Sequence, residues 1–317
     1  MNKYVPAKNP HNHHLYQHGV AIITALLLTA LAITIVASLF WQQQIQVRAV
    51  ENQRLQLQKL WILRGALDWA KLILREDIKY SATDNLTEPW AVPLADTSLD
   101  QYVQKNQDRE IARQAILSGA IQDAQSRLNL TGLATAGKIN EKEILIFERL
   151  LNSLQIETTL ARQAANHMAA SQQNESGGVS SLRYLGFQYP NDLLTIAGFT
   201  PEILNKLESH VIFLPRDTAI NANTASEFVL SAALAPLSLS DARALIVKRT
   251  QSPFKNLNDL AVQLSGTQTS LDANKISLDT NFFLVHGQIT LQQNGLQIIA
   301  LVERNTRNTE VIWVREI

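Results

Sequence analysis

The feature that most constrains this chain is an uncharged, mostly apolar run from Val20 to Trp41, which begins directly after Gly19. At about 1.5 Å of rise per residue, a helix over this run covers roughly the 30 Å hydrocarbon core of a bilayer. The leader before it has no acidic residue, and its Lys3 and Lys8 favour a cytoplasmic N-terminus. We therefore expect a single membrane-spanning helix, with everything after Trp41 on the far side of the membrane.

The Gly19/Val20 junction predicts how the leader is removed. A secretory signal peptide is cut after its apolar segment, whereas a cut between Gly19 and Val20 would lie before it. The apolar helix would then remain in the mature protein, as in pilin-type processing by a prepilin peptidase. On hydropathy alone an ordinary single-pass anchor is the simpler interpretation. Both interpretations predict a bacterial inner-membrane protein with a cytoplasmic N-terminus and periplasmic C-terminal domains.

Composition argues against several classes of function. The 317 residues, 46% of them hydrophobic, suffice for about two domains with real cores. Lys plus Arg number 28, as do Asp plus Glu, so there is no overall basic field to hold nucleic acid. Without cysteine there is no disulfide, thiolate metal site or thiol nucleophile. Four histidines lie in the leader and the other three are scattered, so we expect no enzyme.

The helical pattern continues beyond the apolar run, without proline, to about Arg75. Its outer half is amphipathic, because one apolar stripe recurs at spacings of three and four residues while polar side chains populate the other faces. The stripe comprises Leu60, Leu63, Leu67, Ala70 and Leu74, and the polar positions include Gln53, Gln56, Lys59 and Arg64. Such a stripe needs a sheet or another layer against it, so we expect it in a core together with Trp61 and Trp69.

The middle of the chain predicts a loop, a strand or hairpin, and then a helical domain. Pro89 and Pro93 break any regular element over residues 80–101, and residues 115–134 alternate as a strand or hairpin does. Helices are predicted over residues 157–171 and 193–197, the latter stopped by Gly198. A connector rich in Ser, Gln, Asn and Gly reaches Gly178. Further helix starts are predicted at capping residues Asn140, Thr200, Thr224, Ser238 and Asn256.

After Asn274 the apolar period changes from helical to alternating. The alternating positions are Phe282, Leu284, His286, Gln288 and Thr290, then Leu296, Ile298, Ala300 and Val302, and then Val311, Trp313 and Arg315, and they suit strands. Asn294-Gly295 and residues 305–309 are suitable turns between these segments. Three antiparallel strands are therefore predicted at the C-terminus, and they can cover the stripe of the long helix.

Several short motifs add to these features. They are Gly19-Val20-Ala21 before the apolar run, Glu88-Pro89-Trp90, Asp-Ala-Gln-Ser-Arg-Leu-Asn-Leu at 123–130, Ile-Asn-Ala-Asn-Thr-Ala at 220–225, and Arg249 to Phe254 with Asn258-Asp259-Leu260. Together they resemble the K subunit family of type II secretion minor pseudopilins over nearly the whole chain. The resemblance implies an α+β fold: a long N-terminal transmembrane helix packed on an antiparallel, pilin-like sheet, with a large inserted all-α domain of helix-hairpin-helix or SAM-like modules.

The resemblance also implies a division of the chain. We expect a prepilin leader over 1–19, the transmembrane part of the helix over 20–41, and the first part of the pilin-like domain over 42–135. The helical insert is expected over 136–274 and the C-terminal strands of the pilin-like domain over 275–317.

The implied function is that of a non-enzymatic subunit at the pseudopilus tip, which initiates pseudopilus assembly for protein export. Its implied partners are the I and J minor pseudopilins, the major pseudopilin, the prepilin peptidase, which would cleave and N-methylate it, and the inner-membrane assembly platform. Subunits of the family contact one another through their long helices, so that Leu60, Leu63, Leu67 and Thr24 are the residues expected to serve assembly.

Thr24 is the fifth residue of the expected mature chain, where most pseudopilins carry a glutamate. That carboxylate is thought to neutralise the N-terminal amine of a neighbouring subunit in the apolar core, where an unpaired charge is costly. A threonine cannot do this, which fits a terminal subunit with none above it. A threonine that is merely tolerated in the membrane is the alternative.

Calcium is associated with the family, but this chain departs from the family pattern over residues 165–189, where Glu175 is the only acidic residue. Calcium needs six to eight oxygen ligands, usually with several carboxylates, so we expect no cofactor from this segment. Asp272 and Asp279 could contribute ligands, although a solvated loop is the simpler interpretation of both.

A membrane-tethered DNA-binding protein is the alternative function, because residues 224–264 look like a helix-hairpin-helix module. Such modules bind phosphates through the backbone amides of a glycine-rich hairpin. The hairpin at 235–240 has no glycine, and only Lys248, Arg249 and Lys255 are basic nearby. We therefore expect a protein-interaction scaffold and no nucleic-acid partner.

Overall fold

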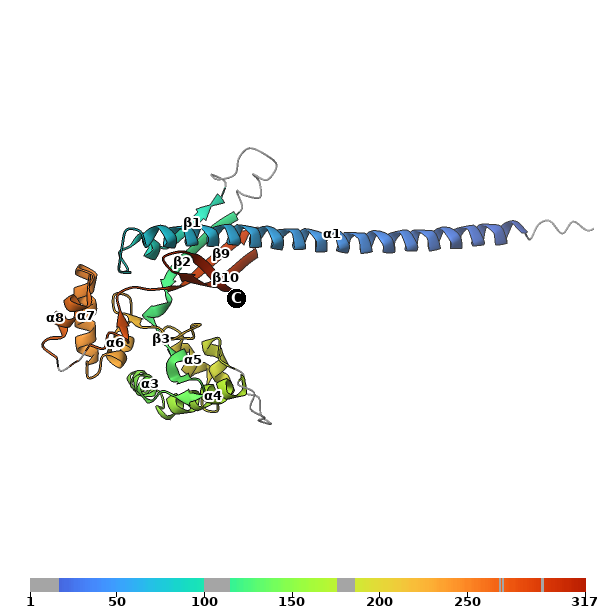
Figure 1. The fold of residues 1–317 in the computed structure, drawn as a ribbon. Helices are drawn as coiled ribbons and strands as arrows, with labels where there is room; N and C mark the ends of the chain where they lie inside the picture. Colours follow the sequence, from blue (N-terminus) through green and yellow to red (C-terminus); the bar gives the residue numbers. More distant parts are fainter. Residues whose placement is uncertain (1–16, 100–114, 176–185, 268, 270, 292–293) are drawn as a thin grey trace, which may run out of the picture. The chain divides into compact units, whose positions relative to one another are not determined.

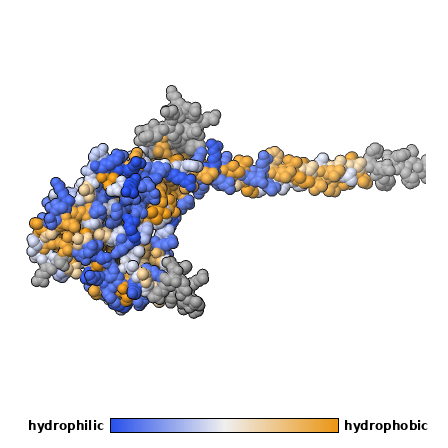
Figure 2. All heavy atoms as spheres, in the orientation of Figure 1, coloured by the Kyte–Doolittle hydropathy of each residue, from blue (hydrophilic) through white to orange (hydrophobic). Residues whose placement is uncertain are grey.

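The computed structural model of the chain describes residues 17–99, 115–175, 186–267, 269, 271–291 and 294–317 (Figure 1). It divides into two compact units, residues 1–58 and 59–317, each described here by itself. In the first unit, the described residues form the N-terminal part of α1 (Gln17–Asp77), and the side chains of residues 19–54 are exposed. Among the described helices, α1 is the one long and apolar enough to cross a membrane, and Figure 2 shows the apolar side chains along it.

The predicted long helix is confirmed. It begins three residues before the expected Val20 and ends at Asp77, two residues beyond the expected Arg75. No proline interrupts this segment, so nothing removes a backbone donor from its hydrogen-bond ladder.

In the second unit, five described strands form an antiparallel sheet in the order β1-β2-β9-β10-β11 (Figure 1). The strands are β1 (Leu94–Ser98), β2 (Ala115–Asp123), β9 (Phe282–Leu291), β10 (Asn294–Arg304) and β11 (Thr309–Glu316). The antiparallel sheet and its three C-terminal strands are thus confirmed, and with the helices below they make the α+β class. The helical region follows β2 and precedes β9, although these two strands are neighbours in the sheet.

Two expectations about the strands are wrong. The loop expected over residues 80–101 contains the short helix η1 (Pro89–Ala91) and the edge strand β1. Pro93 directly precedes β1, a position where proline removes no ladder hydrogen bond. Asn294 and Gly295 are not a turn but begin β10, where they pair with Leu291 and Thr290. Residues 292–293 lie outside the described residues.

The outer half of α1 packs on one face of the sheet. Leu67, Ala70 and Leu74 form a core with Trp90 and with alternate residues of the sheet, namely Phe283, Val285, Ala300 and Val302. Leu63 is fully buried and Leu60 half-buried. A Cβ built on Gly287 would lie 3.2 Å from Leu63 Cδ2, so this glycine permits the close approach of helix and sheet.

The expectations for three other residues of α1 are wrong. Trp61 and Trp69 are 67% and 51% exposed and do not belong to the core. Each lies two positions from a buried leucine, and two helical positions turn a side chain by about 200° away from the buried face. Lys59, expected on a polar face, is buried, because it precedes Leu63 by four residues and so continues the stripe.

The helical region has its own extensive apolar core, to which side chains from Leu128 to Leu278 contribute. Its helices are α3 (Glu141–Ser153), α4 (Thr159–Glu175), η5 (Pro190–Thr195), α5 (Pro201–Leu207), α6 (Glu227–Ala233), α7 (Leu239–Gln251) and α8 (Leu257–Leu264). Short elements link them: η3 (Ala124–Ser126), β3 (Leu128–Asn129), η4 (Leu130–Leu133), β4 (Ala134–Thr135), β5 (Lys138–Ile139), β6 (Val211–Ile212), β7 (Ile220–Asn221) and β8 (Ile276–Ser277).

Most predicted helix starts are confirmed, because Asn140, Thr200, Ser238 and Asn256 each accept a hydrogen bond from a first-turn amide. Thr224 is the exception: Ser226 caps α6 instead, and Thr224 is buried. The helix expected over 193–197 is the 3₁₀ helix η5. Helix α4 reaches Glu175, and the rest of the expected connector lies outside the described residues.

The domain boundaries and the helix-hairpin-helix or SAM-like character of the helical region stay predictions.

Candidate assembly surface and buried polar network

The residues expected to serve processing and assembly lie at different places along α1. Gly19 and Val20 lie inside the helix, exposed. The Thr24 hydroxyl donates to the Ala21 carbonyl oxygen at 3.0 Å, so it is satisfied within its own helix and offers no carboxylate. Leu63 and Leu67 face the sheet, whereas Leu60 is only half-buried. Leu63 and Leu67 therefore hold α1 on the sheet and do not point outward.

The outward side of the same helix segment carries large apolar side chains, including Trp61 and Trp69, which the sequence predicts in the core. Trp61, Gly65, Trp69 and Leu72 are exposed at spacings of three or four residues, and we call these four residues the outward face. The Arg64 guanidinium carbon lies 5.3 Å from the centre of the Trp61 ring. Exposed aromatic residues at helical spacing, with a glycine that allows close approach, suit the packing of another helix.

An apolar groove of about 370 Å³ adjoins this face. Its walls come from α1, from the segment around Trp90 and from β2, with Trp69, Ile73, Val92 and Ile121 among the lining residues. It extends the apolar area of the outward face onto the edge of the sheet.

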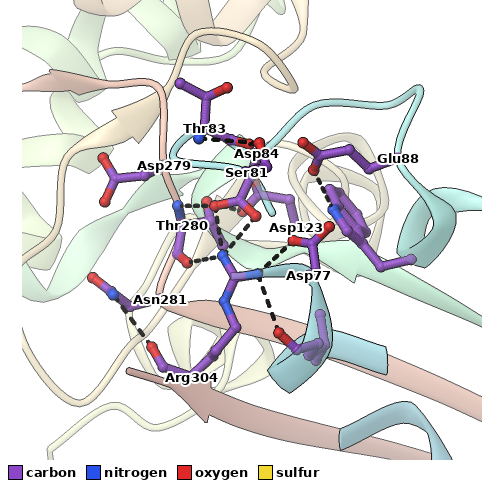
Figure 3. A network of polar contacts seen from close by, with 12 residues as sticks. Asp77, Ser81, Thr83, Asp84, Glu88, Asp123, Asp279, Thr280, Asn281 and Arg304 are labelled. Atoms are coloured by element: carbon purple, nitrogen blue, oxygen red, sulfur yellow. Dashed lines mark hydrogen bonds and ion pairs between the residues drawn. The ribbon is translucent and has the colours of Figure 1, made fainter. Parts of the chain in front are cut away.

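A buried arginine joins the C-terminal end of α1 to the sheet (Figure 3). Arg304, at the end of β10, donates to Asp77 Oδ2 at 2.8 Å and to both carboxylate oxygens of Asp84 at 2.6 Å. It also donates to the Thr280 carbonyl oxygen at 2.9 Å, and its guanidinium carbon lies 4.6 Å from the Phe283 ring centre. Burial raises the pKa of Asp84 to about 7 although Arg304 lowers it.

A second buried carboxylate continues this network toward the helical region. Asp123, at the end of β2, accepts from Asn221 Nδ2 at 2.9 Å, from Thr224 Oγ1 at 2.5 Å and from Thr280 Oγ1 at 2.7 Å. Asn221 Nδ2 also donates to the Asp84 carbonyl oxygen at 3.0 Å. Burial raises the pKa of Asp123, while these hydrogen bonds lower it. The two carboxylates thus connect α1, the sheet and the start of α6.

Comparison with known proteins agrees with this architecture. Two family models, both described as type II secretion system (T2SS) protein K, match residues 126–216 and 220–281. The type II secretion system protein K of Pseudomonas aeruginosa is 25% identical over 310 residues, which cover 91% of this chain and 89% of that relative. The chain belongs to the type II secretion system protein K family. The resemblance inferred from its motifs is confirmed.

A solved structure shares the fold of this family member. It is the crystal structure of the GspK-GspI-GspJ complex from enterotoxigenic Escherichia coli, with a TM-score of 0.64 and 19% identity. The match covers 84% of this chain and 99% of the solved chain.

Two motifs that carried the resemblance meet in the buried network. Asp123 opens the motif at 123–130, and Asn221 and Thr224 belong to the motif at 220–225. Sequence reasoning missed Asp84, Thr280 and Arg304, because a lone polar residue in a loop or at a strand end carries no local signal of burial. Their partners lie far away in the sequence, and only the folded chain brings them together.

The carboxylates of Asp77, Asp84 and Glu88 lie within 4.8 Å of one another, which raises the question of a calcium ion. Their oxygens are already used: Arg304 bonds both aspartates, and Glu88 accepts from the Trp90 indole at 2.7 Å. The guanidinium supplies the positive charge that a metal ion would bring, so this donor set does not fit calcium. Asp272 and Asp279, the residues expected to contribute ligands, are exposed.

The basic residues of the helix-hairpin-helix-like stretch also have internal roles. Arg249 is buried and donates to the Ala222 carbonyl oxygen at 2.6 Å, and Lys248 donates to Gln263 at 2.7 Å. Burial lowers the pKa of Arg249 to about 10, which still leaves it charged at neutral pH. Arg249 therefore stabilises the helical region, where it is not accessible to a phosphate.

Proposed function

We propose that this protein is a non-enzymatic minor pseudopilin that lies at the tip of the type II secretion pseudopilus and initiates its assembly for export across the outer membrane. The observation that carries the proposal is the outward face of α1, where two tryptophans are exposed on the helix that the sheet holds in place. A subunit whose exposed apolar residues lie on its long helix is built to pack against other long helices.

We propose that the leader 1–19 is removed between Gly19 and Val20 by a prepilin peptidase, which leaves the 20–41 helix as a single-pass inner-membrane anchor. The N-terminus is cytoplasmic and the rest of the chain periplasmic, because Lys3 and Lys8 precede the span. Thr24 supports the tip position, since it offers no carboxylate to the amine of a subunit above it.

The proposed partners are the I and J minor pseudopilins, beside the major pseudopilin and the inner-membrane assembly platform. The solved relative is a complex of K, I and J proteins, which supports the first two. Leu63 and Leu67 act in assembly indirectly, by fixing α1 on the sheet, and Leu60 lies at the margin of that contact. The expected division into a pilin-like domain and a helical insert of helix-hairpin-helix or SAM-like modules is part of this proposal, with the insert as a scaffold for protein contacts.

The experiment is co-purification of the full chain with I and J subunits from membranes that contain a prepilin peptidase. We expect Trp61→Gln with Trp69→Gln to abolish co-purification while a mature chain starting at Val20 is still found by intact mass. Leu145→Gln is the matched control, because Leu145 is an exposed apolar residue on α3. Retention of I and J by the tryptophan variant would overturn the helix interface, and an uncut leader would overturn the pseudopilin processing.

A further inference from the structure

A second cleft lies on the face of the sheet that does not carry α1. Its volume is about 490 Å³, and its floor consists of side chains of β9, β10 and β11. Those floor residues alternate with the residues that pack on α1: Leu284 faces the cleft side, whereas Val285 faces the helix. The walls come from the segment 188–191, from the C-terminal half of α5 and from Arg127.

One wall carries an aromatic group. The Tyr189 ring meets the Trp313 ring edge-on at 5.4 Å, and the Arg315 guanidinium carbon lies 4.8 Å from the Tyr189 ring centre. Asp192 holds the backbone of this wall, because its Oδ2 accepts from the amides of Gln188 and Tyr189 at 2.8 Å each. Tyrosine, tryptophan and arginine side chains are the types that dominate binding at protein interfaces.

The cleft is positively charged. Arg127 donates to the Glu208 carbonyl oxygen and to Gln122, each at 3.1 Å, and Arg315 stacks on Tyr189. Within the described part of the chain, neither arginine forms an ion pair with a carboxylate. Glu208 is the acidic residue of the lining. Burial and Arg127 lower the pKa of His286, so this histidine is neutral at pH 7 and two positive charges face one negative charge.

The floor ends at an edge of the sheet. Strand β11 pairs with β10 on one side, and among the described strands none pairs with its other side. The side chains of Trp313 and Arg315 line the cleft, as alternate residues of a strand must share one face. A strand added to this edge would therefore place every second side chain beside Trp313 and Arg315.

We propose that the β11 side of this cleft binds an extended, acidic segment of a partner protein, which adds to β11 as a further strand and places a carboxylate beside Tyr189 and Arg315. The free edge supplies main-chain hydrogen bonds, the aromatic wall supplies apolar contact, and Arg315 selects the acidic side chain. This surface is separate from the outward face of α1, so the segment can bind while the long helices are packed.

The test starts from a random heptapeptide phage library, panned on the detergent-solubilised full chain. We expect enriched peptides with β-branched residues around a fixed Asp or Glu. A fluorescein-labelled synthetic copy of one such peptide should bind with an affinity that falls by about tenfold or more with Arg315→Met, since a charge-assisted hydrogen bond is lost. Arg127→Met should have a smaller effect, because Arg127 bonds Gln122 of β2, three strands away from β11. Arg307→Met, which removes the same charge from an exposed loop, should leave the affinity unchanged.

Two peptide variants separate the parts of the proposal. Exchange of the acidic residue of the peptide for its amide should weaken binding as Arg315→Met does. N-methylation of every second peptide amide should abolish binding for one of the two alternating sets of amides, the set that faces β11. The proposal is overturned if no acidic peptide is enriched, or if Arg315→Met binds the peptide as the unaltered chain does. It is also overturned if N-methylation has no effect, or if free glutarate displaces the peptide as well as unlabelled peptide does.

Discussion

Arg304 Nη2 lies 2.6 Å from both carboxylate oxygens of Asp84, and both side chains are only 3% exposed. This pair ties the end of β10 to the loop that follows α1. Because Asp77 and the Thr280 carbonyl oxygen bond the same guanidinium, one side chain connects three segments distant in sequence.

Arg304→Met should destabilise the protein by about 3 kcal/mol, because it leaves two carboxylates buried without their cation. The measurement is denaturant unfolding of the full chain in detergent. Arg307→Met serves as the control and should stay within about 0.5 kcal/mol of the unaltered chain, since Arg307 is exposed. A double variant, Arg304→Met with Asp84→Leu, should recover part of the loss; no recovery would contradict the pairing.

The raised pKa of Asp84 predicts a pH dependence with a definite sign. Asp84 binds its proton more tightly when folded, with a pKa of about 7 against an ordinary 3.8. Its contribution to the free energy of unfolding therefore decreases as pH rises between these two values. We expect the stability advantage of the unaltered chain over Asp84→Asn to shrink from pH 4 to pH 7 in thermal unfolding. An advantage that grows with pH would show instead that Arg304 lowers the pKa of Asp84 by more than burial raises it.

Two glycines should respond to alanine in opposite directions. A Cβ on Gly119 would lie 2.6 Å from the His286 carbonyl oxygen of the paired strand, so Gly119→Ala should destabilise the sheet by about 1–3 kcal/mol. A Cβ on Gly65, in α1, meets nothing within 4 Å, and Gly65→Ala should stabilise by up to about 1 kcal/mol. Thermal unfolding of both variants checks the pair, and equal shifts would argue against this packing.

Thr24→Val should leave processing and co-purification with I and J subunits unchanged. The Thr24 hydroxyl is bonded within its own helix, so its removal leaves no partner unsatisfied. Intact mass and the pull-down described above measure both. Loss of either would mean that the hydroxyl contacts another protein.

How far the sequence predicts this structure depends on how local each signal is. The caps at Asn140, Ser238 and Asn256 could be recognised because a cap and its amide lie within four residues. The edge strand β1 could not, because its strand conformation depends on pairing with β2 across residues 100–114. Residue type alone predicts the wrong burial for Trp61 and Lys59, because the side of the helix on which each residue lies decides its exposure.

By itself, the sequence determined the long helix with its apolar N-terminal part, the C-terminal strands and the family, since these follow from runs, periods and motifs within short segments. Tertiary structure alone decided which polar residues meet. The buried network draws its residues from five separate segments, and these residues are Asp84, Asp123, Asn221, Thr280 and Arg304. Their polar groups can be buried only because they form hydrogen bonds with one another. It likewise decided which side of α1 the sheet covers, and therefore which tryptophans remain exposed.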